Sequence, residues 1–124
     1  AGIPMTVDAE ESERLELSLD ILDAVHGAQA LSGWGGFGLA VQAYQRRALA
    51  VIDWLAERAR AHGQRWNVRL VKGAYWDSEV KRAQVEGHRG YPVFTRKANT
   101  DVSYLACARR LFEHGDAFYP QFAT

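Results

Sequence analysis

Apolar and polar residues follow two different repeats along this chain, one typical of strands and one typical of helices. Short apolar runs predict strands at Gly2–Val7, Phe37–Tyr44, Trp66–Val71 and Ala117–Ala123. Apolar residues spaced three or four positions apart predict helices over Ser12–Val25, from Leu49 to Gly63, over Ser78–Glu86, and from an Asn99 or Thr100 cap to Gly115. The resulting order β-α-β-α-β-α-α-β predicts a parallel sheet with crossover helices.

The spacing also predicts which side chains face the sheet. In the first helix the wide apolar stripe comprises Leu15, Leu19 and Leu22, with Leu17 and Ile21. The last helix carries Val102, Leu105, Ala106, Arg109 and Phe112. Just before the first helix, Asp8 and Glu11 have the Asp-x-x-Glu form of a capping box, which predicts that the helix follows at once.

One strand carries a charge where a parallel sheet usually has Val or Ile. Trp66, Val68 and Leu70 share one face of this strand, so Arg69 lies on the opposite face, and we expect it to be buried. A buried guanidinium must be paired or face a ligand. A structural salt bridge is the alternative to a functional role for Arg69.

Two architectures fit the element order. A doubly wound nucleotide-binding fold would show a glycine-rich fingerprint after its first strand, where this chain has Asp8–Glu11. A (β/α)₈ barrel uses roughly 30 residues per unit, so four strands make about half of one. We therefore predict an α/β fold, a partial TIM barrel of about four βα units. Residues 1–124 would be the central fragment of a single barrel domain, because the chain lacks an initial Met and both ends fall within predicted strands.

Composition excludes several classes of protein. The 124 residues carry 15 Lys and Arg against 15 Asp and Glu, a balance that argues against nucleic-acid binding. A single cysteine, Cys107, excludes an internal disulfide framework, and no Cys or His spacing predicts a metal site. The four histidines fall at helix ends or in loops, where we expect solvated side chains. No apolar run approaches the roughly 18 residues of a membrane span.

Barrel enzymes gather their active-site residues at the carboxyl ends of the strands. Those positions are Asp8, Gln42 with Tyr44, Arg69–Trp76 and Thr124. Taken alone, Asp8 could be a helix cap and Gln42 a satisfied buried amide. Lys72-Gly73-Ala74 places a cation beside small residues, where backbone can approach a phosphate or a flat ring. The order of acids before bases in Asp77–Arg82 needs no function, because the helix macrodipole explains it.

Seven segments together resemble a known family. They are Val7–Glu11 (VDAEE), Gln42–Gln45 (QAYQ), Arg69–Glu79 (RLVKGAYWDSE), Gly90–Val93 (GYPV), Thr95–Lys97 (TRK), Thr100–Cys107 (TDVSYLAC) and Tyr119–Thr124 (YPQFAT). In order and over nearly the whole chain, they resemble the proline dehydrogenase domain of proline utilization A, a family of bacterial bifunctional enzymes. The resemblance implies a distorted (β/α)₈ barrel that binds FAD noncovalently at the strand carboxyl ends.

The resemblance also implies a role for individual residues. Asp8 would be catalytic, and Arg69 would be both catalytic and close to the flavin N5. The remaining cofactor-binding residues would be Ala9, Gln42, Lys72, Gly73, Ala74, Trp76, Thr95, Lys97 and Thr124. No position matches the Lys and the Arg pair with which family members bind the carboxylate of proline. We therefore expect the fragment alone to be inactive.

The implied activity is FAD-dependent oxidation of L-proline to Δ¹-pyrroline-5-carboxylate, with hydride transfer to flavin N5 and reoxidation by a quinone. The implied partners are L-proline, the quinone and the remainder of the polypeptide, including the rest of the barrel and an aldehyde dehydrogenase domain. The location would be cytoplasmic, with peripheral contact at the inner face of the bacterial membrane. Two alternatives stay open at this point: a non-catalytic scaffold derived from a barrel, and a nicotinamide-dependent enzyme on another parallel fold.

Overall fold

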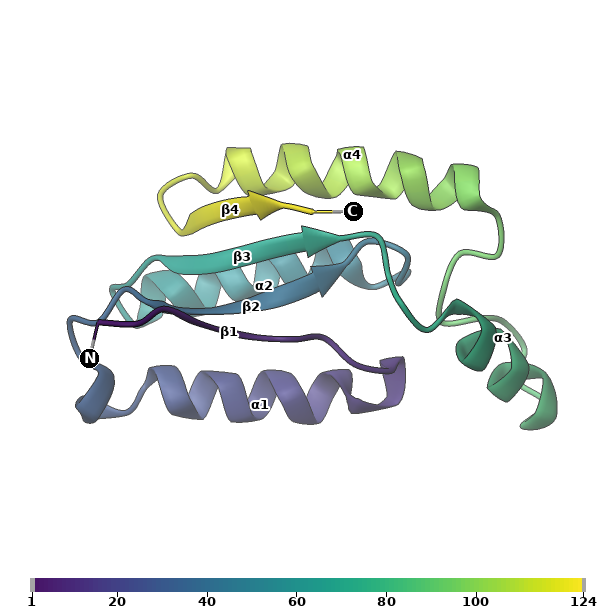
Figure 1. Ribbon diagram of the computed structural model, residues 1–124, viewed down its shortest axis with the longest axis horizontal. Coiled ribbons are helices and arrows are strands. Elements are labelled where there is room, and N and C mark those ends of the chain that lie inside the picture. Colours follow the sequence, from purple (N-terminus) through teal and green to yellow (C-terminus); the bar gives the residue numbers. More distant parts are fainter. Residues whose placement is uncertain (1, 124) are drawn as a thin grey trace.

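The computed structural model describes residues 2–123 as one parallel sheet with helices (Figure 1). The four strands, in the spatial order β1-β2-β3-β4, are β1 (Met5–Val7), β2 (Phe37–Gln42), β3 (Trp66–Val71) and β4 (Phe118–Phe122). The helices are α1 (Leu15–His26), α2 (Ala48–Ala61), α3 (Trp76–Val85) and α4 (Lys97–Glu113), and the short 3₁₀ turns are η1 (Ser12–Arg14) and η2 (Gln29–Leu31). The predicted element order and the parallel sheet are confirmed.

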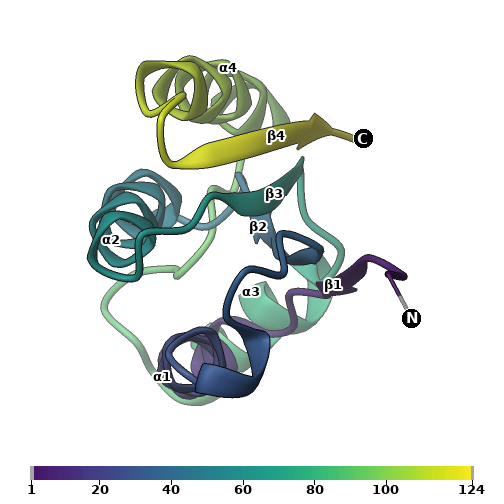
Figure 2. The same ribbon diagram turned by 90° about the vertical axis from the view of Figure 1, so that its left-hand side faces the viewer.

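Three helices cover one face of the sheet. Figure 2 shows α1, α2 and α4 on the same side of the strands, while the opposite face carries no helix from residues 2–123. The fourth helix, α3, lies beyond the carboxyl ends of the strands (Figure 1). No helix within residues 2–123 is long and apolar enough to cross a membrane.

The core lies between the sheet and these three helices. Its largest fully buried apolar side chains are Trp66, Phe118, Ile52, Leu55, Leu70 and Leu111. All six residues of β2 are buried, as its continuous apolar run predicts, and β3 alternates between buried and half-buried residues. Pro120 removes one backbone donor from β4, which predicts a strand that is irregular or at a special place in the sheet; it pairs with Val68 in regular register, and β4 lies at the edge. The proline is tolerated because β4 is the edge strand of the described sheet, where a missing N–H leaves no ladder bond broken.

The predicted helix starts are wrong in two places. Asp8 does not cap the first helix, because the backbone is still extended at Glu11 and η1 precedes α1. The N–H of Ser12 at the start of η1 is bonded instead to Glu79, which comes from α3. Helix α4 begins at Lys97 after an extended Arg96, so neither Asn99 nor Thr100 is its cap. At the first helix a tertiary contact replaces the local cap that the sequence suggested.

The predicted apolar faces of α1 and α4 are only partly right. Leu15, Leu19 and Leu22 pack on the core, but Leu17 and Ile21 are exposed, since they lie on the opposite side of a helix with 3.6 residues per turn. In α4 the buried residues are Thr100, Cys107 and Leu111. The residues expected on its apolar face, Val102, Leu105 and Phe112, are exposed.

The prediction of solvated histidines is wrong for His26. Its ring is buried and stacks on Trp66 with 3.8 Å between ring centroids, and its Nδ1 lies 3.3 Å from Oε1 of Gln64. Burial lowers the pKa of His26, so the ring is neutral at physiological pH. His62 and His114 are also more enclosed than expected, since each lies within hydrogen-bond distance of an aspartate.

Candidate active site

The parallel strands place the ends of β1, β2 and β3 at one edge of the sheet. A hollow of about 300 Å³ opens there. Its lining residues are Asp8, Ala9, Ala40, Gln42, Val71, Gly73, Ala74 and Tyr75. The register of the sheet explains the gathering, because Gln42 pairs with Val71 and Val7 pairs with Leu39. Residues 8–9 and 73–75, which follow β1 and β3, therefore flank the end of β2.

The side chain of Gln42 joins these two flanking segments. Its Nε2 donates to the backbone oxygen of Glu10 at 2.8 Å, and its Oε1 accepts the backbone N–H of Ala74 at 3.1 Å. The amide is almost fully buried. The expectation of a satisfied buried amide therefore holds, and the same two bonds fix both walls of the hollow relative to each other.

A second hollow of about 370 Å³ lies on the other side of Gly73. Its lining residues are Tyr44, Lys72, Gly73, Trp76, Thr95, Lys97 and Thr100. Thr95 reaches this place because the preceding segment pairs with the residues that follow β2: the N–H of Phe94 donates to the oxygen of Tyr44 at 2.8 Å. The indole Nε1 of Trp76 donates to the oxygen of Phe94 at 3.0 Å, which fixes the start of α3 beside the same segment.

The two lysines of the second hollow share one acid. Lys72 Nζ lies 2.6 Å from Asp101 Oδ1, and Lys97 Nζ lies 3.3 Å from Asp101 Oδ2. Lys72 first, and then Lys97, holds the pKa of Asp101 below its usual value. The carboxylate is therefore ionised at neutral pH and orients both ammonium groups, which leaves the cluster with one net positive charge.

The loop that separates the two hollows depends on glycine. Gly73 has a φ of 146°, and a Cβ there would lie 2.3 Å from Cγ of Tyr44. The Tyr44 ring is buried, so an added methyl group would press against packed atoms, and its hydroxyl has no hydrogen-bond partner within the part of the chain that the structure describes. Burial, and then the Glu79 carboxylate, raise the pKa of Tyr44 to about 12, so the phenol stays neutral.

Arg69 departs from its predicted environment. Its side chain is 40% exposed rather than buried, because it projects from the face of β3 that no helix of residues 2–123 covers. Its charged neighbour is Asp8, with 3.9 Å between Nη1 and Oδ1, and the Asp8 side chain is 86% exposed. An ion pair this long and this exposed adds little stability. The guanidinium is thus available at the mouth of the first hollow.

All the predicted site residues except Arg69 and Thr124 line one of the two hollows. Thr124 lies outside the described residues. The sequence pattern does not identify Tyr75 or Asp101 as site residues, although both lie in segments that carry the family resemblance. The sequence marks Tyr44 only as the end of a predicted strand. The position of Tyr75, two residues after the small Gly73, is the local signal that could have identified it.

Comparison with known proteins decides the family. The family model described as proline dehydrogenase matches residues 1–124. The chain belongs to the proline dehydrogenase family. The bifunctional protein PutA of Salmonella typhimurium is 56% identical over 122 residues, which cover 98% of this chain and 9% of that protein. This chain therefore corresponds to about a tenth of the length of that proline dehydrogenase relative.

Solved structures of relatives show the same fold. A mutant of proline utilization A (PutA) from Bradyrhizobium japonicum matches with a TM-score of 0.97 and 59% identity, over 99% of this chain and 13% of that one. PutA from Bdellovibrio bacteriovorus, inactivated by N-propargylglycine, matches with a TM-score of 0.93 and 34% identity, over 98% of this chain and 12% of that one. The sheet and helices are thus part of the TIM-like barrel of a proline dehydrogenase domain, as predicted.

The close approach of Gly73 to Tyr44 yields a stability prediction. In the full-length protein that contains this chain, Gly73→Ala should lower the free energy of unfolding by about 2–4 kcal/mol, from backbone strain and overpacking. The matched control is Gly90→Ala, where a Cβ meets nothing within 4 Å and φ is not positive. Denaturant titration of both variants measures the difference, and equal midpoints would show that the ring of Tyr44 yields to the added methyl group.

Proposed function

We propose that this chain forms part of the active site of an FAD-dependent proline dehydrogenase, which oxidises L-proline to Δ¹-pyrroline-5-carboxylate. The observation that carries the proposal is the gathering of the predicted cofactor residues around Gly73, at the carboxyl ends of β1, β2 and β3. In barrel enzymes this edge of the sheet carries the chemistry. The family match over residues 1–124 supports proline as the substrate.

The residues around the second hollow fit a dinucleotide. Lys72 and Lys97 offer ammonium groups, Thr95 and Thr100 offer hydroxyls, and Trp76 offers a flat apolar face. Phosphate oxygens accept hydrogen bonds from these cations and hydroxyls, and an aromatic ring can pack on the indole.

FAD, when bound, supplies a two-electron acceptor, and the family resemblance assigns a quinone as the final acceptor. Arg69 and Asp8 would act at the first hollow. Arg69 carries a guanidinium, and it projects from a sheet strand that holds its Cα fixed. A fixed cation stabilises negative charge that develops beside it during the reaction. Asp8, 3.9 Å away, would orient the guanidinium and moderate its charge.

The remaining partners are also part of the proposal. Residues 1–124 would be a central segment of one barrel domain, and the rest of the polypeptide would complete the barrel and bind the carboxylate of proline. An aldehyde dehydrogenase domain in the same polypeptide fits the bifunctional relatives that share 56% identity with this chain. A cytoplasmic location with peripheral membrane contact would bring the enzyme to its quinone.

The proposed activity can be tested on the full-length protein. Purified as expressed, it should be yellow, and anaerobic addition of L-proline should bleach its flavin absorbance. L-alanine, which lacks the ring, is the control and should leave the spectrum unchanged. A protein that binds no flavin, or whose flavin L-proline does not reduce, would contradict the proposal and favour a non-catalytic scaffold.

Arg69→Met in the full-length protein tests the role of the fixed cation. Loss of one preorganised electrostatic group typically slows a reaction by about 10²–10³-fold, so L-proline should reduce the flavin more slowly by that factor. The flavin potential should become more negative, because the reduced cofactor loses a neighbouring positive charge. Stopped-flow absorbance and a redox titration measure the two effects.

Arg65→Met is the matched comparison, since Arg65 is an arginine with structural contacts. Its Nη2 donates to the backbone oxygens of Gly115 and Phe118, and its guanidinium lies 3.6 Å from the centroid of the Tyr119 ring. This variant should lower the melting temperature and leave the reduction rate per bound flavin unchanged. If Arg69→Met behaves in that same way, Arg69 is structural and its proposed role is wrong.

A further inference from the structure

Helix α3 contains a carboxylate that is completely removed from solvent. Glu79 is 0% exposed, although it lines neither of the two hollows. It lies on the first turn of α3, and its own backbone N–H donates to the oxygen of Tyr75 at 2.9 Å. The helix macrodipole favours an acid in this turn, but it does not explain why the side chain is buried.

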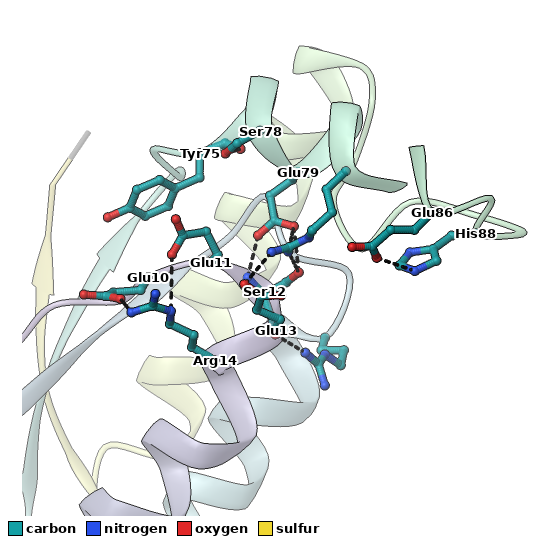
Figure 3. Close-up of polar contacts among 12 residues, drawn as sticks. Glu10, Glu11, Ser12, Glu13, Arg14, Tyr75, Ser78, Glu79, Glu86 and His88 are labelled. Atoms are coloured by element: carbon teal, nitrogen blue, oxygen red, sulfur yellow. Dashed lines mark hydrogen bonds and ion pairs between the residues drawn. The ribbon is translucent and has the colours of Figure 1, made fainter. Parts of the chain in front are cut away.

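Three donors compensate for the burial of this charge. The backbone N–H of Ser12 donates to Oε1, the hydroxyl of Ser12 donates to Oε2 at 2.7 Å, and Nη2 of Arg82 lies 2.8 Å from Oε2 (Figure 3). A buried carboxylate is stable only when such donors satisfy it. Because Ser12 is 67 residues away in the sequence, these bonds join two distant parts of the chain.

Arg82, which pairs with Glu79, also contacts a second acid, Glu13, and the hydroxyl of Ser12. Its Nη1 lies 2.8 Å from Glu13 Oε1, and its Nη2 donates to the Ser12 hydroxyl at 3.3 Å. From the other side, Nη2 of Arg47 donates to the backbone oxygen of Ser12 at 2.9 Å. Both the N–H and the C=O of Ser12 are thus held by side chains from other elements, which fixes its position.

The two segments that Glu79 joins are the two walls of the first hollow. Ser12 ends the segment that begins with Asp8, and Tyr75 directly precedes α3. Gln42 bridges these walls at Glu10 and Ala74, and Glu79 bridges them a second time, farther from the sheet. Figure 3 shows Glu79 directly beside Ser12, with Tyr75 and Glu11 to their left.

We propose that Glu79 is a positioning residue for the substrate, which sets the distance between the Asp8 wall and the Tyr75 wall of the first hollow. This inference rests on the proposed function and goes beyond it, because Glu79 itself touches neither hollow. With only the Gln42 bridge, the outer parts of the two walls would separate. Contacts made equally to bound substrate and to the transition state would then weaken together, which raises KM and leaves kcat nearly unchanged.

The test uses the Glu79→Gln variant of the FAD-loaded full-length protein. Glutamine keeps the size of the side chain but removes the charge that Arg82 and the Ser12 N–H recognise. KM for L-proline should rise about 5–20-fold, with kcat within about twofold of wild type. A second readout does not depend on turnover: the Ser12 amide hydrogen should exchange with solvent faster in the variant.

Glu86→Gln is the matched control. Glu86 directly follows α3, but it is exposed and pairs with His88 at 2.9 Å rather than with Ser12. This variant should leave KM and the exchange of the Ser12 amide unchanged. If Glu79→Gln does not fold, Ser12→Ala removes a single donor to the carboxylate and should raise KM in the same direction.

The outcomes separate this inference from the proposed function. If wild-type protein is not reduced by L-proline, the proposed function is wrong, and the positioning role for substrate fails with it. If wild type is active but KM of Glu79→Gln or Ser12→Ala is unchanged, only the role of Glu79 is wrong. A lower melting temperature or lower flavin content with an unchanged KM would likewise overturn it, because a merely structural carboxylate gives that pattern.

Discussion

The carboxamide of Gln42 holds the candidate site together. It donates to Glu10 and accepts from Ala74, so one buried side chain at the end of β2 joins the loops that follow β1 and β3. Parallel strands bring these loops to the same edge of the sheet but do not fix the distance between them. If the two loops moved apart, the buried amide of Gln42 and two backbone groups would lose their hydrogen bonds. That cost fixes the distance between the loops.

Some charged side chains around this edge lie beside an acid or base from a different element. Asp101 on α4 orients Lys72 at the end of β3, and Asp8 lies beside Arg69. The buried carboxylate of Glu79 on α3 accepts a hydrogen bond from the hydroxyl of Ser12 on η1. Such pairs reduce the freedom of long side chains before any ligand arrives, which lowers the cost of ordering them when one binds. Contacts between elements therefore contribute to building the site, alongside the pairs Lys97–Asp101 within α4 and Arg82–Glu79 within α3.

The sequence was sufficient to predict the strands, the parallel sheet and the edge at which the candidate residues gather, because these follow from apolar periodicity and strand order. It was not sufficient to predict the exposure of Arg69, which depends on what covers the face of the sheet opposite α1, α2 and α4. It also missed Glu79, since nothing local links a glutamate in an acids-first helix to Ser12. The capping box at Asp8 failed for the same reason: the N–H of Ser12 is bonded to a residue 67 positions away.

The chain itself builds the two walls before FAD, its proposed cofactor, binds, because the Gln42 bridge uses only groups of this chain. Amide hydrogen exchange of Ala74 in FAD-free full-length protein tests this claim most directly, because that N–H donates to Gln42. Exchange should be at least about tenfold slower in wild type than in Gln42→Leu, the difference that one buried hydrogen bond provides. An Ala74 amide that exchanges equally fast in both proteins, and becomes protected only when FAD is added, would contradict the account.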